Sequence, residues 1–124
     1  MAIELNHIVV PAKDAKASAQ FIADILGIEA GAQWGPFYPV VVSNGVTLDY
    51  VDDTRDFQSH HCAFLVTDEE FDASFDRIKA AGIQYWADPH HDKPNEINHL
   101  YGGRGVYFDD PDGHNMEIIT APYA

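Results

Sequence analysis

The sequence reads GVYFDDPDGHNMEII from Gly105 to Ile119. Two runs rich in β-branched, aromatic and other apolar residues, 105–108 and 115–119, flank a segment rich in Asp, Pro and Gly. Such runs are typical of strands, and the residues between them are typical of a turn. We therefore predict a hairpin of two strands around the turn 109–113.

A strand and a helix are predicted ahead of this hairpin. Residues 61–66 form a short apolar run, and Thr67 with Glu70 has the spacing of a capping box, which starts a helix. Gly82 is expected to end that helix. The apolar positions in between recur at helical spacing: Phe71, Phe75 and Ile78.

The first half of the chain has the same order of elements. Residues 5–10 are a short run rich in β-branched residues, which predicts a strand. Asp14 is expected to cap the helix that follows, and Gly27 is expected to end it. Two further strands are expected at 40–42 and 46–51, because the Asn-Gly pair between them is a strong hairpin signal.

Four landmarks recur in one order in both halves. They are a histidine on the first strand, a glycine after the helix, a turn glycine, and a carboxylate four residues after that turn: His7, Gly27, Gly45 and Asp49, then His61, Gly82, Gly113 and Glu117. An internal repeat of this kind predicts two copies of one unit. We expect the α+β fold class, with two βαβββ modules at about 1–56 and 57–124. Together they are expected to form a curved mixed β-sheet around a metal-binding cavity, within a single domain, 1–124.

The cavity follows from the alternation of side chains along strands. The face that packs on the helices is expected to carry these residues: Ile8, Val10, Leu48, Val51, Cys62, Phe64 and Met116. His7, Asp49, His61 and Glu117 then point to the other side of the sheet. A polar inner face is costly unless its groups are paired or bind something.

Imidazole and carboxylate donors suit a divalent ion such as Fe, Mn, Ni, Co or Zn, and the absence of a thiolate argues against a structural zinc cage. We predict His7, His61 and Glu117 as metal ligands. The shorter Asp49 is either a fourth ligand or a group that acts as a base or through a bridging water.

Three stretches resemble the vicinal oxygen chelate superfamily, which includes glyoxalases, extradiol dioxygenases, fosfomycin-inactivating enzymes and bleomycin-binding proteins. They are the closing residues 103–117, the opening 5–8, and His61-x-Ala63-Phe64-x-Val66. The resemblance covers essentially the whole chain and implies paired modules around a metal held by His7, His61 and Glu117. In the glyoxalase branch a fourth carboxylate, usually glutamate, stands where Asp49 stands here.

The expected site suits three kinds of function. The first is a metal-dependent lyase or isomerase that acts on a small vicinal-oxygen substrate by proton transfer, with Glu117 or Asp49 as the catalytic carboxylate. The second is a non-haem Fe(II) extradiol-type dioxygenase, which needs an additional acid–base histidine and a tyrosine; His99 and Tyr107 are the best-placed residues. The third is a protein that sequesters an antibiotic or metabolite without chemistry.

Several other segments are also candidates for a role in the site. Tyr101 and Arg104, at the mouth of the last hairpin, are candidate substrate contacts or surface hydrogen-bonding groups. The insertion 88–99 is expected to be a surface loop or a lid over the cavity. The aromatic segment 34–39 suits a pocket wall, a dimer contact or ordinary loop packing, and His114 is expected at the surface of its turn.

Composition narrows the partners. The net charge is −13, and both halves are acidic, so neither nucleic acid nor an anionic membrane is an expected partner. No apolar run approaches the roughly 18 residues of a membrane span, and no secretory signal is visible. Cys62 is the only cysteine, which excludes an internal disulfide. We expect a cytoplasmic protein that binds a small-molecule substrate and, by family analogy, forms a homodimer.

Overall fold

The computed structural model describes residues 2–123, and the chain divides into two compact units. One unit contains the residues up to Asp24 together with Ile28–Gln58. The other contains Ile25–Gly27 and the residues from Ser59 onward. Each unit is described by itself below.

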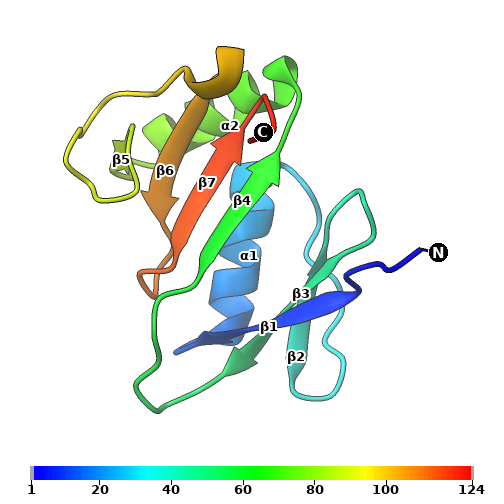
Figure 1. Ribbon diagram of the computed structural model, residues 1–124. Coiled ribbons are helices and arrows are strands. Elements are labelled where there is room, and N and C mark those ends of the chain that lie inside the picture. Colours follow the sequence, from blue (N-terminus) through cyan, green and yellow to red (C-terminus); the bar gives the residue numbers. More distant parts are fainter. Residues whose placement is uncertain (1, 124) are drawn as a thin grey trace. The chain divides into compact units, whose positions relative to one another are not determined.

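The first unit contains a three-stranded sheet. Its elements in chain order are β1 (His7–Ala12), most of α1 (Ala15–Leu26), β2 (Phe37–Val41) and β3 (Thr47–Asp52). The strand order is β1-β3-β2, with β1 parallel to β3 and β2 antiparallel to it (Figure 1). The hairpin predicted around the Asn-Gly pair is therefore confirmed, because β2 and β3 are antiparallel neighbours on either side of it.

The ends of α1 are where the sequence placed them. The Asp14 carboxylate accepts a hydrogen bond of 3.1 Å from the backbone N–H of Ala17, which is the contact expected of an N-cap. Gly27 follows the helix with a φ of +71°, a left-handed conformation that glycine adopts without steric cost.

The core face of the first sheet differs from the prediction at one position. Leu48 and Tyr50 are buried on β3, whereas Val51 is only partly buried. Residues 48 and 50 share a face because side chains alternate, so Val51 was assigned to the wrong side. Strand β2 also starts at Phe37, three residues earlier than expected, so half of the aromatic segment 34–39 is sheet rather than loop.

The second unit contains a four-stranded sheet. Its elements in chain order are β4 (His61–Leu65), α2 (Asp68–Ala80), β5 (Tyr85–Trp86), the 3₁₀ turn η1 (Leu100–Gly102), β6 (Gly105–Asp109) and β7 (Asn115–Ile119). The strand order is β4-β7-β6-β5; Figure 1 shows β4, β7 and β6 as the long green, red and orange-brown arrows. Strand β4 runs parallel to β7, and β6 is antiparallel to both of its neighbours.

The α+β class is confirmed, and the second unit has the full βαβββ order. The first unit has three strands within the described residues. Where the second unit has β5, the first has only an isolated bridge between Trp34 and Phe37.

The capping box of α2 is present. The Thr67 hydroxyl accepts from the Glu70 backbone N–H at 3.2 Å, and the Glu70 carboxylate accepts from the Thr67 N–H at 2.8 Å. Hydrogen bonds from the Thr67 backbone N–H and the Thr67 side chain to the Glu70 carboxylate lower the pKa of Glu70 below its usual value.

Replacing Thr67 by alanine is expected to lower the free energy of unfolding by about 1 kcal/mol, the usual cost of a lost N-cap. Urea denaturation followed by circular dichroism measures this change. Thr54→Ala, at an exposed position outside any helix or strand, is the control and should change stability by less than about 0.5 kcal/mol. Equal losses in the two variants would contradict a capping role for Thr67.

The turn after β6 is more ordered than its composition suggests. The Asp110 carboxylate accepts backbone hydrogen bonds of 2.9 Å from both Asp112 and His114. His114 is fully buried, and its Nδ1 accepts a 2.8 Å hydrogen bond from the His60 backbone N–H. The expected surface position of His114 was therefore wrong, because the imidazole satisfies a backbone donor inside the fold.

Cys62 is buried on β4, on the strand face opposite His61, and burial raises the pKa of its thiol. Across residues 2–123, none of the helices has the length and apolar character that crossing a bilayer requires.

Candidate metal centre

The register of β4, β7 and β6 brings three site residues onto one face of the second sheet. His61 lies opposite Asn115 and Ala63 opposite Glu117 on the parallel pair, while Tyr107 lies directly opposite Glu117 on the antiparallel pair. Residues two apart on a strand share a face, so His61, Tyr107 and Glu117 are neighbours. This shared face was predicted for His61 and Glu117.

The two predicted ligands are in direct contact. His61 Nε2 lies 3.1 Å from Glu117 Oε1, and His61 Nδ1 lies 2.9 Å from the carbonyl oxygen of Asn115. A carbonyl only accepts, so Nδ1 carries a proton and donates it. Nε2 is then the ring nitrogen that faces the carboxylate.

A ring nitrogen and a carboxyl oxygen at this distance share either a proton or a metal ion. Metal-binding histidines commonly donate the other ring N–H to a backbone carbonyl, as His61 does. Donors that each lie about 2.1 Å from one ion are about 3.0 Å apart when they subtend a right angle. The His61–Glu117 pair therefore fits a divalent ion of the imidazole- and carboxylate-binding kind.

The Glu117 carboxylate is completely buried. Its ion-pair partner among the described residues is His61, and no lysine or arginine there reaches it. A buried carboxylate without a compensating charge costs several kcal/mol. The need for positive charge beside Glu117 is the electrostatic feature that defines this site.

Two tyrosines complete the group. The Tyr123 hydroxyl donates to Glu117 Oε2, and the Tyr107 hydroxyl lies 3.3 Å from that of Tyr123. Burial raises the pKa of Tyr123, and the Glu117 carboxylate raises it further. The pKa of Tyr107 is also raised, chiefly by burial.

One side of the His61 ring is open. Its side chain is 49% exposed, and Tyr107 stacks against the ring with centroids 5.9 Å apart. Tyr107 also lines a cavity of about 330 Å³ beneath the insertion that follows β5. A small molecule in that cavity would contact Tyr107, which itself borders the metal donors.

The insertion is held by specific contacts. The Asp88 carboxylate accepts backbone hydrogen bonds from Asp92 at 3.0 Å and Lys93 at 2.8 Å. The His91 ring stacks on Trp86 with centroids 3.6 Å apart. Of the predicted substrate contacts on this segment, His99 lines the cavity that Tyr107 also borders. The insertion is thus a structured wall of the cavity.

Tyr101 and Arg104 do not line that cavity. The Tyr101 ring is 62% exposed and packs on Tyr123 with centroids 5.0 Å apart. Arg104 reaches α2: Nη1 lies 2.7 Å from Asp72 Oδ1, Nη2 lies 3.1 Å from Asp68 Oδ1, and the guanidinium covers the Phe71 ring at 4.5 Å. Both carboxylates raise the pKa of Arg104.

Arg104→Ala is expected to lower the free energy of unfolding by about 1–2 kcal/mol, because it removes two hydrogen-bonded ion pairs and the cover of Phe71. Arg104→Lys should recover less than half of this, since an ammonium cannot bind two carboxylates in the same fork. Chemical denaturation measures both. Metal affinity in Arg104→Ala should stay within about twofold of the wild type; a larger change would place Arg104 in the site.

The other two predicted site residues lie on the first unit. His7 is exposed on β1, with Nδ1 2.7 Å from Asn6 Oδ1, and Asp49 is half-buried on β3. The β1–β3 register pairs His7 with Thr47 and Val9 with Asp49, so His7 and Asp49 share a face of their own sheet. Across residues 2–123, groups of three or more His, Cys, Asp or Glu side chains placed to hold a metal are absent. The structure thus joins His61 to Glu117, and His7 belongs to the other unit.

Two participants had not been expected. Tyr123 lies six residues after Glu117, in a segment without strand or helix periodicity, and no sequence signal marks it. The Asn115 carbonyl is a backbone group, and only the strand register reveals its contact with His61.

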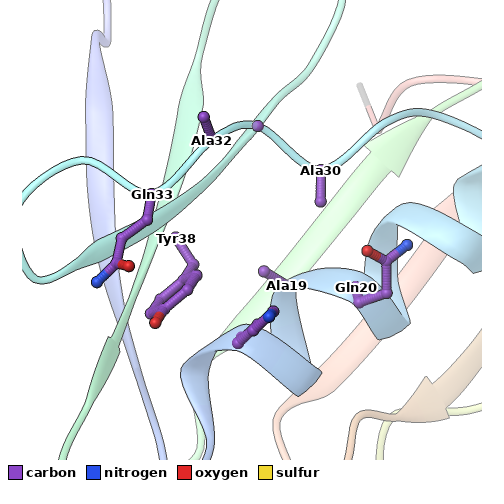
Figure 2. Close-up of a pocket in the computed structure, with 8 residues that line it drawn as sticks. Ala19, Gln20, Ala30, Ala32, Gln33 and Tyr38 are labelled. Atoms are coloured by element: carbon purple, nitrogen blue, oxygen red, sulfur yellow. The ribbon is translucent and has the colours of Figure 1, made fainter.

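The first unit has a cavity of its own, of about 300 Å³. Figure 2 shows Tyr38 of β2 and Gln33 on one side and Gln20 of α1 on the other. Its lining includes Lys16 but neither carboxylates nor imidazoles. This cavity therefore lacks the donors of a metal centre and contains none of the predicted site residues.

Comparison with known proteins identifies the family. The model described as "Glyoxalase/Bleomycin resistance protein/Dioxygenase superfamily" matches residues 4–118. The chain belongs to this superfamily, as the sequence resemblance implied.

Individual relatives include several enzymes. The structure named "Oxidase ChaP-H2" is 56% identical with a TM-score of 0.98, and the match covers 100% of this chain and 98% of that one. The "Glutathione transferase FosA" of Serratia marcescens is 30% identical over 131 residues, covering 100% of this chain and 85% of FosA. A third relative is a mutant of the fosfomycin resistance protein FosX from Listeria monocytogenes, whose structure contains Mn(II) and 1S,2S-dihydroxypropylphosphonic acid. It is 23% identical with a TM-score of 0.74, and the match covers 98% of this chain and 95% of FosX.

Proposed function

We propose that this protein is a metal-dependent oxidase that uses dioxygen on a small substrate with two neighbouring oxygen atoms. The observation that carries the metal part is the 3.1 Å contact of His61 Nε2 with Glu117 Oε1, whose carboxylate is buried and otherwise uncompensated. The likeness to an oxidase at 56% identity over the whole chain favours oxidation over the other reactions of the superfamily.

His7 is proposed as the third ligand. A set of two imidazoles and one carboxylate with open positions is the set that non-haem Fe(II) oxygenases use. When bound, such an ion supplies Lewis-acid polarisation of the substrate oxygens and electron exchange with dioxygen. The proposed ion is divalent: Fe, Mn, Ni, Co or Zn.

The chain's own residues have separate roles in this proposal. His61 binds the ion while its half-exposed ring leaves one side open to the substrate. Tyr107 and His99 form part of the substrate cavity, which the insertion lines. Both Glu117 oxygens already have partners, so proton transfer is assigned to Asp49, a half-buried carboxylate.

The second candidate is a lyase or isomerase that works by metal-assisted proton transfer. Such a reaction needs a base that accepts the proton and does not consume dioxygen, and the Asp49 carboxylate is also the proposed base here. We further propose that the protein acts as one domain, as a cytoplasmic homodimer, without nucleic acid or membrane partners.

Metal analysis and oxygen uptake test these proposals. Protein purified without a tag or added metal should contain about one divalent ion per chain. With Fe²⁺ restored anaerobically, catechol as the probe should give oxygen uptake on an oxygen electrode. Exchange of C–H protons of a 2-hydroxy ketone with deuterated water under anaerobic conditions, with Ni²⁺ or Zn²⁺ and no oxygen uptake, would replace the oxidase by the lyase or isomerase. Absence of metal, with ligand binding unchanged in His61→Ala, would instead show a sequestering protein.

A further inference from the structure

The second oxygen of Glu117 has a partner that the metal proposal does not use. Oε1 faces His61, whereas Oε2 accepts a hydrogen bond from the Tyr123 hydroxyl. The carboxylate is fully buried, so an Oε2 without a donor would pay the cost of desolvation without compensation. Tyr123 therefore distinguishes the two oxygens, leaving Oε1 as the one that faces the imidazole.

The segment that carries Tyr123 is fixed against the sheet. Thr120 N–H donates to the Arg104 carbonyl at 2.9 Å, and the Thr120 hydroxyl accepts from the Arg104 N–H at 2.8 Å. A Cβ at Gly103 would lie 2.7 Å from Cβ of Ala121, so the segment passes directly over this glycine. The Tyr101 ring then supports the Tyr123 ring. These contacts hold residues 120–123, which follow β7, against residues 101–104.

Tyr107 supports the same hydroxyl from the other side. Its OH lies 3.3 Å from that of Tyr123, and its ring stacks on His61. The four side chains therefore form a connected group in which Oε1 of Glu117 faces His61 and Oε2 accepts from Tyr123. Carboxylate ligands in metal sites are typically oriented by such hydrogen bonds, whose loss usually costs 10–100-fold in metal affinity.

We propose that Tyr123 is a positioning residue of the metal centre: its phenol hydroxyl holds Glu117 so that Oε1 alone is presented to the ion beside His61 Nε2. This inference rests on the proposed metal-dependent function. It adds a residue from outside the sheet to the site, and it makes the geometry of Glu117 depend on the segment after β7.

The first test compares two single-hydroxyl deletions in the same ring stack. Tyr123→Phe should weaken Mn²⁺ and Zn²⁺ binding about 10–100-fold by isothermal titration. Tyr101→Phe, which keeps the stack and leaves Tyr123 intact, should stay within about twofold of the wild type. Affinity of Tyr123→Phe equal to that of the wild type would overturn the proposal.

The second test separates positioning from direct ligation. Protein loaded with Fe³⁺ should lack the visible phenolate-to-iron charge-transfer band, because Tyr123 donates a hydrogen bond and does not bind the ion. A band present in the wild type and absent in Tyr123→Phe would make Tyr123 a ligand and would overturn the proposal.

The third test needs no metal and so separates this inference from the proposed function. In metal-free protein, Tyr123→Phe should lower the melting temperature by roughly 3–6 °C, because buried Oε2 loses its donor. In a Glu117→Gln background, Tyr123→Phe should lower the melting temperature by less than half as much, because the charged acceptor of the hydrogen bond is gone. If the wild type binds no metal but this coupling is found, the metal function fails while the Tyr123–Glu117 contact stands. Equal shifts in both backgrounds would disprove the contact.

Discussion

Glu117→Gln is expected to reduce metal affinity by more than about 100-fold. Loss of a group that merely orients a ligand costs 10–100-fold, so loss of a charged ligand should cost more. The amide keeps the size of the side chain, and the variant is therefore expected to fold. His61→Ala should have an effect of similar size, because Nε2 is the partner of Glu117 Oε1 at 3.1 Å.

Isothermal titration with Mn²⁺ and Zn²⁺ measures both losses. His90→Ala is the matched control, since His90 is exposed on the insertion, and it should leave affinity unchanged. A thermal scan gives a second readout: metal at 100 times its Kd should stabilise the wild type by about 2.7 kcal/mol and Glu117→Gln hardly at all. If Glu117→Gln bound metal as tightly as His90→Ala, the site would have to lie elsewhere.

Phe71→Ala is expected to lower the free energy of unfolding by about 3–5 kcal/mol, the usual cost of removing a buried aromatic ring. Phe71 is fully buried on α2, lies next to Phe75 with ring centroids 5.8 Å apart, and is covered by the Arg104 guanidinium. Removal of the ring leaves a cavity, and the Arg104 guanidinium also loses the aromatic face that it covers. The loss is a large share of the 5–15 kcal/mol typical of a domain.

Urea denaturation followed by fluorescence and circular dichroism measures this loss. Leu65→Ala on β4 is the control, because that side chain is 61% exposed and should cost less than about 1 kcal/mol. A loss below about 1.5 kcal/mol for Phe71→Ala would show that the neighbouring side chains close the cavity.

The regular elements were predictable because their signals are local. The hairpin of β6 and β7, the capping box of Thr67 and the end of α1 at Gly27 each depend on residues a few positions apart. Strand β5 was missed because two residues are too few to show alternation. Tyr50 was missed as a core residue because the neighbouring apolar residue Val51 was assigned to the core face in its place.

The candidate site was only partly predictable. The shared face of His61 and Glu117 was predicted because the repeat placed equivalent residues on both halves and strand parity then put the two side chains on one side of the sheet. His114 was assigned to the surface because nothing in the sequence shows that its ring accepts from a backbone N–H 54 residues away. Tyr123 escaped prediction for the same reason: its contact depends on how the chain turns back after β7, which is a tertiary property.

The position of Cys62 bears on the proposed oxidase reaction. Enzymes that handle dioxygen are exposed to oxidative self-damage, and the species most readily attacked is an accessible thiolate. Here the side chain of the only cysteine is buried on β4, and burial raises the pKa of its thiol, which favours the unreactive protonated form. The protein should therefore tolerate alkylating reagents and repeated turnover without losing a cysteine.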